Sequence, residues 1–234
     1  MGAIIPAILP ASRQDLDERL LRLQGVTSEV QIDVVDGRFA TPATWPYTDG
    51  AHGLADGLPE LGSFRFEVDL MVENPEKAIG GWVAAGASRI TVHAETTRNL
   101  AHVIDEFQHT YGHDRDFAPE LLSFGLALNS ATDTAIIEPF LDRCNYVQFM
   151  GIARIGRQGE PFDRRVLQKI HAFHRKYPDM LIQVDGGVSR DTAPELLRAG
   201  ASRLVVGSAL LRTSSLKDEY ILFEELTRSN GLYT

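Results

Sequence analysis

The sequence predicts a (β/α)8 TIM barrel, of class α/β, that forms a single domain over residues 1–234. Short apolar runs rich in β-branched residues alternate with longer segments of helical period along the whole chain. Eight such runs are present, and most are apolar almost throughout, as expected for strands buried on both faces of a parallel sheet. The length of 234 residues also suits a fold that typically takes about 250 residues.

The expected strands follow one another at regular spacing. They cover residues 3–9, 30–35, 64–72, 89–93, 122–128, 146–150, 181–185 and 203–206. An open doubly wound sheet is the competing fold, but no G-x-G-x-x-G motif follows the first run. The alternation therefore favours the closed barrel.

Helices are expected between the strands. The first has an apolar stripe formed by Leu16, Leu20, Leu21 and Leu23, with Ser12 as its N-cap. A second begins at Asn74-Pro75, where the Asn74 side chain is expected to cap it, and stops at Gly86. Three more are expected: one capped by Ser189 and ending at Gly200, one carrying Val166, Ile170 and Phe173, and one over residues 216–226.

Composition narrows the class of protein. The formal net charge is −9 and the isoelectric point is near 5.2, which argues against nucleic acid and membrane partners. A single cysteine, Cys144, is expected to pack in the interior, and its isolation fits a reducing compartment such as the cytoplasm. The first residues lack the pattern of a signal peptide, and no apolar run is long enough for a membrane span.

Acidic residues at strand ends are the first candidates for chemistry, because barrel active sites lie at the carboxyl ends of the strands. Asp33, Asp69 and Asp185 lie at or near the carboxyl ends of three different strands and are expected to converge on one mouth. Gln31 shares a strand face with Asp33. Each aspartate alone could equally be a rim residue or a helix cap. His93 ends a fourth strand, where it could be a ligand, an acid or a hydrogen-bonded structural residue.

Glycines after the last two strands suggest a phosphate site. Gly186 and Gly187 follow Asp185, and Gly207-Ser208 follow the eighth strand. Glycines allow the backbone to approach a phosphate, and barrels often bind phosphate at these two loops. Either motif alone is equally well explained by turn glycines.

Taken in order, these motifs resemble the ribulose-phosphate 3-epimerase family. The matching segments are QIDVVDGRFATP (31–42), EVDLMV (67–72), ITVHAE (90–95), GLALNSAT (125–132), VDGGV (184–188) and VGSA (206–209). The resemblance implies that Asp33 and Asp185 move a proton on and off the carbon beside a ketose carbonyl, through an enediolate. It also implies a small phosphorylated sugar as substrate, Gly186, Gly187, Gly207 and Ser208 as its phosphate site, and a homo-oligomer.

The resemblance further implies a divalent metal, no organic cofactor, and methionines that line the site, here Met71 and Met150. The two histidine ligands of the family are replaced by Gln31 and Asp69, and a serine of the first strand by Ala7. If a metal is bound, Gln31, Asp33, Asp69 and Asp185 offer only oxygen ligands, which favours Mg or Mn over Zn or Fe.

The alternative is a metal-free site in which Asp69 is protonated or paired with an arginine of the surrounding loops. Arg38, Arg154 and Arg157 are the candidates, the last two from the segment 153–159 that corresponds to the family's glycine-rich lid.

Two other functions compete with epimerisation. The first is a lyase or decarboxylase on the same barrel, although its Asp-x-Lys-x-x-Asp pattern lacks the lysine in Asp33-Val34-Val35-Asp36. The second is a non-catalytic homologue that only binds phosphosugars. The long loop expected over residues 39–53, with Trp45 and Tyr47, is a further candidate for a functional role.

Overall fold

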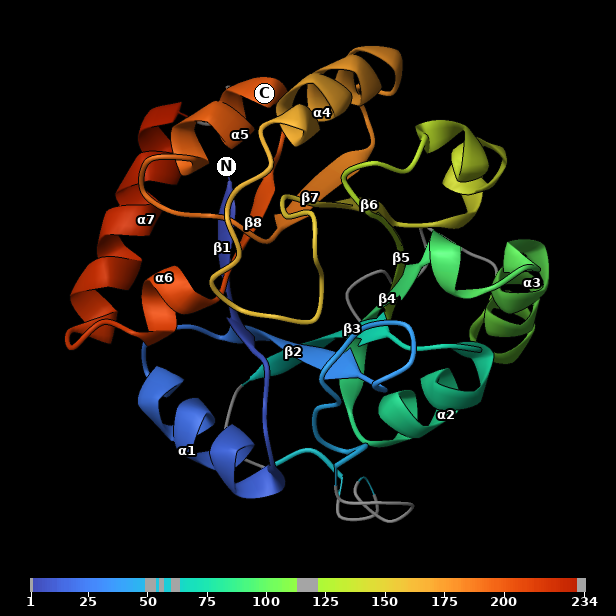
Figure 1. The fold of residues 1–234 in the computed structure, drawn as a ribbon, viewed down its shortest axis with the longest axis horizontal. Helices are drawn as coiled ribbons and strands as arrows, with labels where there is room; N and C mark the ends of the chain where they lie inside the picture. Colours follow the sequence, from blue (N-terminus) through green and yellow to red (C-terminus); the bar gives the residue numbers. More distant parts are fainter. Residues whose placement is uncertain (1, 49–53, 55–56, 60–63, 113–121, 231–234) are drawn as a thin grey trace.

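The chain folds as a closed parallel barrel in a computed structural model that describes residues 2–48, 54, 57–59, 64–112 and 122–230. Eight strands pair in sequence order, and β1 closes the sheet against β8 (Figure 1). The strands are β1 (Ala3–Ile8), β2 (Glu29–Val35), β3 (Arg65–Met71), β4 (Ala87–His93), β5 (Ser123–Leu128), β6 (Tyr146–Met150), β7 (Leu181–Asp185) and β8 (Arg203–Val206). All the expected strands are confirmed, with bounds that differ by at most two residues.

Helices surround the barrel on the outside (Figure 1). They are α1 (Arg13–Leu23), α2 (Glu76–Ala84), α3 (Leu100–Tyr111), α4 (Arg165–Lys176), α5 (Ala193–Ala199), α6 (Ser208–Leu211) and α7 (Leu216–Asn230), with 3-10 turns η2 (Ala94–Thr96), η3 (Thr134–Ile136) and η4 (Glu138–Arg143). Within the described ranges, no helix is long and apolar enough to cross a membrane.

The helix predictions hold with three corrections. Ser12 caps α1 by accepting from the Asp15 amide, but Leu21 is 56% exposed and lies outside the buried stripe. Asn74 does not cap α2: it has a left-handed φ of 52°, and Pro75 is the residue before the helix. The Ser189 hydroxyl accepts from the Thr192 amide in a turn, so α5 begins only after that turn.

Side chains along each strand alternate between the outside and the inside of the barrel, and these two faces differ in polarity. The outward side chains pack against the helices in a large apolar core that includes Cys144. The inside of the barrel is polar. Its buried polar side chains include Gln31, Asp33, Glu67, Asp69, Thr91, His93, Gln148, Gln183 and Asp185. Such groups are costly to bury unless they are bonded, so their partners define the site.

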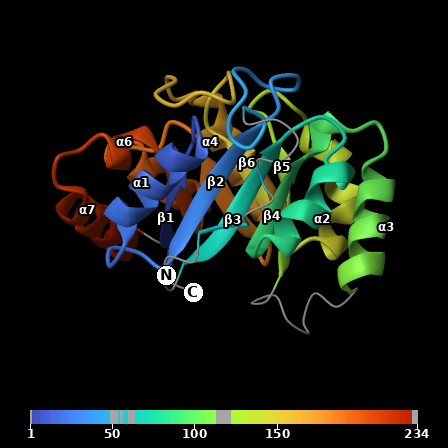
Figure 2. The same cartoon turned by 90° about the horizontal axis from the view of Figure 1, so that it is seen from below.

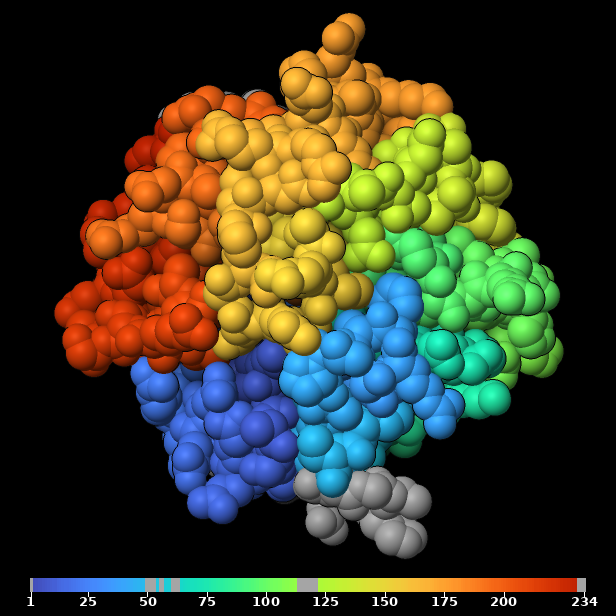
Figure 3. Space-filling model, in the orientation of Figure 1, coloured from blue at the N-terminus to red at the C-terminus, as the bar shows by residue number. Residues whose placement is uncertain are grey.

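Two loops rise from the carboxyl ends of the strands, as Figure 2 shows for the segments after β2 and β6. In the space-filling view they meet over the barrel mouth (Figure 3). The Thr44 hydroxyl donates to the Asp33 carbonyl and accepts from the Val35 amide, which ties the first loop to the end of β2. Trp45 is buried against Trp82, and Tyr47 is 42% exposed. Residues 49–53 of the expected loop lie outside the described residues.

Candidate active site

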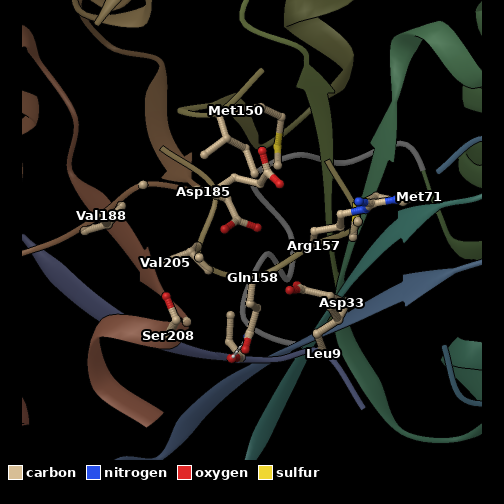
Figure 4. Close-up of a pocket in the computed structure, with 18 residues that line it drawn as sticks. Leu9, Asp33, Met71, Met150, Arg157, Gln158, Asp185, Val188, Val205 and Ser208 are labelled. Carbon is tan, nitrogen blue, oxygen red and sulfur yellow. Dashed lines mark hydrogen bonds between the residues drawn. The ribbon is translucent and has the colours of Figure 1, made fainter. Parts of the chain in front are cut away.

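Three aspartates from three strands meet at the carboxyl end of the barrel. Asp33 and Asp69 are register partners on β2 and β3, and Asp185 ends β7. Each offers a carboxylate oxygen within 4.8 Å of the others, and all three side chains are buried. Figure 4 shows Asp33 and Asp185 projecting into the same cavity from different strands. The structure therefore brings together the acidic residues that the sequence places on separate strands.

Amide donors hold this cluster of aspartates. Gln31 Nε2 donates to Asp33 Oδ1 and to Asp185 Oδ2, each at 2.7 Å. Gln148 Nε2 donates to Asp69 Oδ2 at 2.9 Å. The Gln31 side chain thus turns its nitrogen, and not its oxygen, toward the carboxylates. This orientation differs from the expectation that Gln31 supplies a fourth oxygen ligand, because a nitrogen that donates both hydrogens has no lone pair for a metal.

His93 is a hydrogen-bonded partner of Asp69. It is fully buried, and its Nε2 lies 3.1 Å from Asp69 Oδ1. Burial alone lowers the pKa of His93, but the charge and hydrogen bond of Asp69 outweigh it and the net pKa is raised. Its ring also packs on Phe39 of the first loop, with centroids 5.4 Å apart.

Among the described residues, Asp69 forms no ion pair with Arg38, Arg154 or Arg157, which contradicts the expected pairing with a loop arginine. Both carboxylate oxygens of Asp69 are bonded, one to His93 and one to Gln148. Arg154 pairs with Glu160, and Arg157 Nε donates to the Thr41 carbonyl. Arg157 does line the cavity beside the aspartates (Figure 4), where its charge is available to an anionic ligand.

Burial and mutual repulsion change the acidity of the cluster. The pKa of Asp185 is raised to about 7, first by burial and then by the charge of Asp69. The pKa of Asp33 is raised well above its ordinary value by burial, and then by the charges of Asp185 and Asp69. Carboxyls whose pKa values are raised from the ordinary acidic range more readily hold a proton at physiological pH, as a general acid must. The pair can therefore act as general base and general acid.

The same carboxylates could form a divalent metal site. Their oxygens are close enough to share one cation, and repulsion among the carboxylates adds to burial in raising the pKa values of Asp33 and Asp185. A hard divalent cation prefers carboxylate oxygens and would relieve that repulsion. The donor chemistry of Asp33, Asp69 and Asp185 thus fits such an ion.

The predicted phosphate residues line one side of the same cavity. Its walls include Met71, Met150, Gly186, Gly187, Gly207 and Ser208. Gly186 and Gly187 have φ values of 94° and 68°, which side chains rarely adopt. A Cβ on Gly187 would lie 2.9 Å from Phe162, and one on Gly207 would lie 2.9 Å from Gln158 Nε2. Gly186 and Gly187 require glycine because of their left-handed φ, whereas a side chain at Gly207 would displace only the end of Gln158.

Residues 153–159, which we call the lid segment, close the mouth of the cavity. Gln158 Nε2 donates to the Ala7 carbonyl at 3.0 Å, and the Arg157 bond to Thr41 is 3.1 Å. The cavity left beneath is about 60 Å³. Ligand sites usually enclose about 300 Å³ or more, so we expect the lid segment to move when a ligand enters.

Sequence reasoning missed the polar side chains beneath the aspartates. Gln183 and Arg203 carry hydrogen bonds that reach the cluster, and neither is at the carboxyl end of its strand. The available signal is alternation along β7: Gln183 and Asp185 must share the inner face. A glutamine in an otherwise apolar buried strand is itself a reason to look for its partner.

Comparison with known proteins identifies the family of the chain. The model of the ribulose-phosphate 3 epimerase family matches residues 3–211. The chain belongs to the ribulose-phosphate 3-epimerase family. It is 30% identical to ribulose-phosphate 3-epimerase of Bacillus subtilis, over 93% of this chain and 95% of that enzyme. It is 27% identical to the enzyme of Aquifex aeolicus, over 93% of each chain. The family consists of isomerases that epimerise carbohydrate phosphates.

Solved structures confirm the fold. The 3-keto-L-gulonate-6-phosphate decarboxylase of Vibrio cholerae superimposes with a TM-score of 0.73 at 12% identity, covering 99% of this chain and 100% of that one. The 3-hexulose-6-phosphate synthase of Salmonella typhimurium gives 0.70 at 13% identity, covering 98% and 100%. At these identities the likeness extends to the barrel and not to the reaction.

Proposed function

We propose that this protein epimerises a ketose phosphate at C3, converting D-ribulose 5-phosphate to D-xylulose 5-phosphate or acting on a close relative of that sugar. The observation that carries the proposal is the placement of Asp33 and Asp185. They approach one cavity from β2 and β7, with pKa values raised by burial and by the neighbouring carboxylates. The similarity to curated ribulose-phosphate 3-epimerases supports the choice of substrate.

The reaction needs one aspartate ionised and the other protonated. The ionised carboxylate takes the C3 proton, and the electron pair of the broken C–H bond moves toward the carbonyl to give an enediolate. The second aspartic acid then gives its proton to C3 from the opposite face, and the carbonyl forms again. Gln31 can hold both groups through this exchange, because its amide donates to a carboxylate oxygen in either protonation state.

We propose that Asp33, Asp69 and Asp185 hold Mg or Mn rather than Zn or Fe, since all three ligands are carboxylates. When bound, such a cation stabilises negative charge on the enediolate oxygens. The protein itself contributes the proton transfers of Asp33 and Asp185, and Asp69 is kept in place by His93 and Gln148.

The phosphate is proposed to lie at Gly186, Gly187, Gly207 and Ser208, on the side of the cavity away from β2 and β3. Gly186, Gly187 and Gly207 have no side chains to cover the backbone, so its N–H groups can reach phosphate oxygens directly. Arg157 of the lid segment adds a positive charge at the mouth. The expectations of a cytoplasmic homo-oligomer are retained as part of this proposal, on the family resemblance.

The position of Asp36 argues against the alternative function as a lyase or decarboxylase. Its carboxylate accepts from the backbone amides of Arg38, Phe39 and Glu73, so it organises the loop after β2. A second acidic group facing substrate from that loop is therefore missing from the described residues. The binding-protein alternative predicts no proton exchange at all, which an assay of turnover distinguishes directly.

The test is conversion of D-ribulose 5-phosphate followed by NMR, with Mg²⁺, Mn²⁺, Zn²⁺ or EDTA present. We expect xylulose 5-phosphate to form fastest with Mg²⁺ or Mn²⁺. Protein with both Asp33→Asn and Asp185→Asn, purified in the same way, controls for a contaminating epimerase. No conversion beyond that control, with any metal, would overturn the proposal for this substrate.

The lid segment gives a second expectation. Gln158→Ala removes its bond to the Ala7 carbonyl, which is worth about 1 kcal/mol, and should lower kcat/KM by about fivefold. Arg154→Ala is the matched control, because Arg154 is exposed in the same segment and bonds only Glu160 among the described residues. Steady-state kinetics give kcat/KM for the two variants. An equal decrease in both would show that closure of the lid segment does not depend on the Gln158 bond.

A further inference from the structure

We infer that Arg203 and Gln183 are positioning residues for the reaction: they fix which end of each amide faces the catalytic aspartates. The inference rests on the proposed function for its catalytic part. It concerns a chain of hydrogen bonds that runs through the inside of the barrel from the amino ends of the strands to the aspartate cluster. We call Arg203, Gln183, Gln31 and Gln148 the amide relay.

The relay starts at Arg203, which can only donate. Its Nε donates to Gln183 Oε1 at 2.7 Å, and its two terminal nitrogens donate to Glu29 and Glu67 at 3.1 and 2.9 Å. The side chain is 11% exposed, so water offers little competition. Because the oxygen of Gln183 is taken by the guanidinium, the nitrogen of the same amide must face the other way.

Gln183 passes this direction on to two further amides. Its Nε2 has two hydrogens that face three acceptors: Glu67 Oε1, Gln148 Oε1 at 2.8 Å and Gln31 Oε1 at 3.2 Å. The oxygens of Gln31 and Gln148 are thereby occupied on the side away from the aspartates. All three glutamine side chains are fully buried, so each amide has to find its partners inside this network.

The relay ends on the carboxylates of the aspartate cluster. Gln31 uses its two amide hydrogens on Asp33 and Asp185, and Gln148 donates to Asp69. The two ends of a glutamine amide have nearly the same shape, and an ionised carboxylate already favours the NH₂ end because it can only accept. A protonated aspartic acid can also donate to an amide oxygen, and the bonds from Gln183 then keep the NH₂ ends of Gln31 and Gln148 facing the cluster. An amide oxygen facing a carboxylate would repel it. The spacing of Asp33 and Asp185 thus depends on a single NH₂ group, and Gln183 and Arg203 support its direction from the far side.

The first test is Gln183→Met, which keeps the length of the side chain and removes the polar end. We expect kcat to fall between about tenfold and 100-fold, because the acid–base pair loses its alignment. KM should change less than twofold, because the phosphate residues do not touch Gln183. Arg203→Lys retains a donor for the Gln183 oxygen and should keep kcat within threefold of the original.

Thr91→Val is the matched control. Thr91 is also fully buried inside the barrel, but its hydroxyl bonds Tyr146 and not the relay. It should lower the melting temperature without the selective loss of kcat. The inference is overturned if Gln183→Met and Thr91→Val, compared well below their melting temperatures, lose kcat equally, or if the Gln183→Met loss falls on KM.

A readout without turnover separates the relay from the proposed function. In protein labelled with ¹⁵N-glutamine, the buried side-chain amides should exchange slowly with solvent and give shifted NH₂ signals. The chemical shifts of the Gln31 and Gln148 NH₂ groups should change in Gln183→Met and remain the same in Arg203→Lys and Thr91→Val. If Gln183→Met does not fold, Arg203→Gln replaces it, since a glutamine can also accept and so no longer fixes the direction. Unmoved signals would overturn the relay, whereas a normal spectrum without epimerase activity in the wild type would overturn the proposed function.

Discussion

Replacing either Asp33 or Asp185 with asparagine is expected to lower kcat for epimerisation by at least about 10³-fold. Each aspartate has its own face of C3, so neither can replace the other. The substitution keeps the shape of the side chain, and a buried amide removes repulsion from the cluster, so both variants should fold. The measurement is kcat and KM for D-ribulose 5-phosphate with the preferred metal.

The two variants should differ in which epimer exchanges its C3 proton with solvent. Each retains one functional aspartate, which can still remove the proton of the epimer whose C3–H faces it. In D₂O we therefore expect one variant to exchange only the ribulose sugar and the other only the xylulose sugar. Asp133→Asn is the control, since Asp133 is an N-cap of η3 away from the cavity. Exchange of the same epimer by both variants would contradict the opposed arrangement.

Asp185→Asn should make the metal-free protein more stable at pH 7.5. The pKa of Asp185 rises from 3.8 in an open chain to about 7 in the fold, so the folded protein binds this proton more tightly than the unfolded chain does. The stability is fully present below about pH 4 and is lost as the pH rises through about 7. At about 1.4 kcal/mol per pH unit this loss is about 4 kcal/mol, or roughly 10 °C in Tm.

Thermal melts in EDTA at pH 5 and pH 7.5 measure the effect. The variant should exceed the wild type at pH 7.5 and match it more closely at pH 5. His93 acts with the same sign in both proteins, because its raised pKa also makes stability fall with rising pH. Excess Mn²⁺ should reverse the order, since the wild type keeps all three carboxylates. A variant less stable than the wild type in EDTA at pH 7.5 would show that the cluster is not under electrostatic strain.

The fold and the acidic cluster were predictable for one physical reason. Parallel strands in a barrel end at the same rim, so Asp33, Asp69 and Asp185 had to meet once the strands were recognised. The glycines after β7 and β8 follow the same logic, because the loops at those ends share a wall of the cavity. Alternation on β2 likewise places Gln31 on the inner face beside Asp33.

What Gln31 does there was not predictable from its own strand. The direction of its amide depends on Gln183 and, through it, on Arg203, which are far away in sequence and join it only when the barrel closes. The two wrong helix predictions, at Asn74 and Leu21, are explained by the immediate surroundings of each residue. Asparagine suits both a helix cap and a left-handed turn, and at Asn74 the turn before Pro75 takes it. Leu21 lies on the solvent side of α1, where a single exposed leucine is tolerated.

The central claim is that two aspartates exchange protons with C3 from opposite sides, and a single turnover in D₂O tests it most directly. Excess protein is mixed with protiated D-ribulose 5-phosphate, and the xylulose 5-phosphate is examined by ¹H NMR and mass spectrometry. The account predicts that the product carries deuterium at C3, because the proton removed by one aspartate is not the one that the other returns. Product that keeps its original C3 proton would contradict the two-aspartate mechanism.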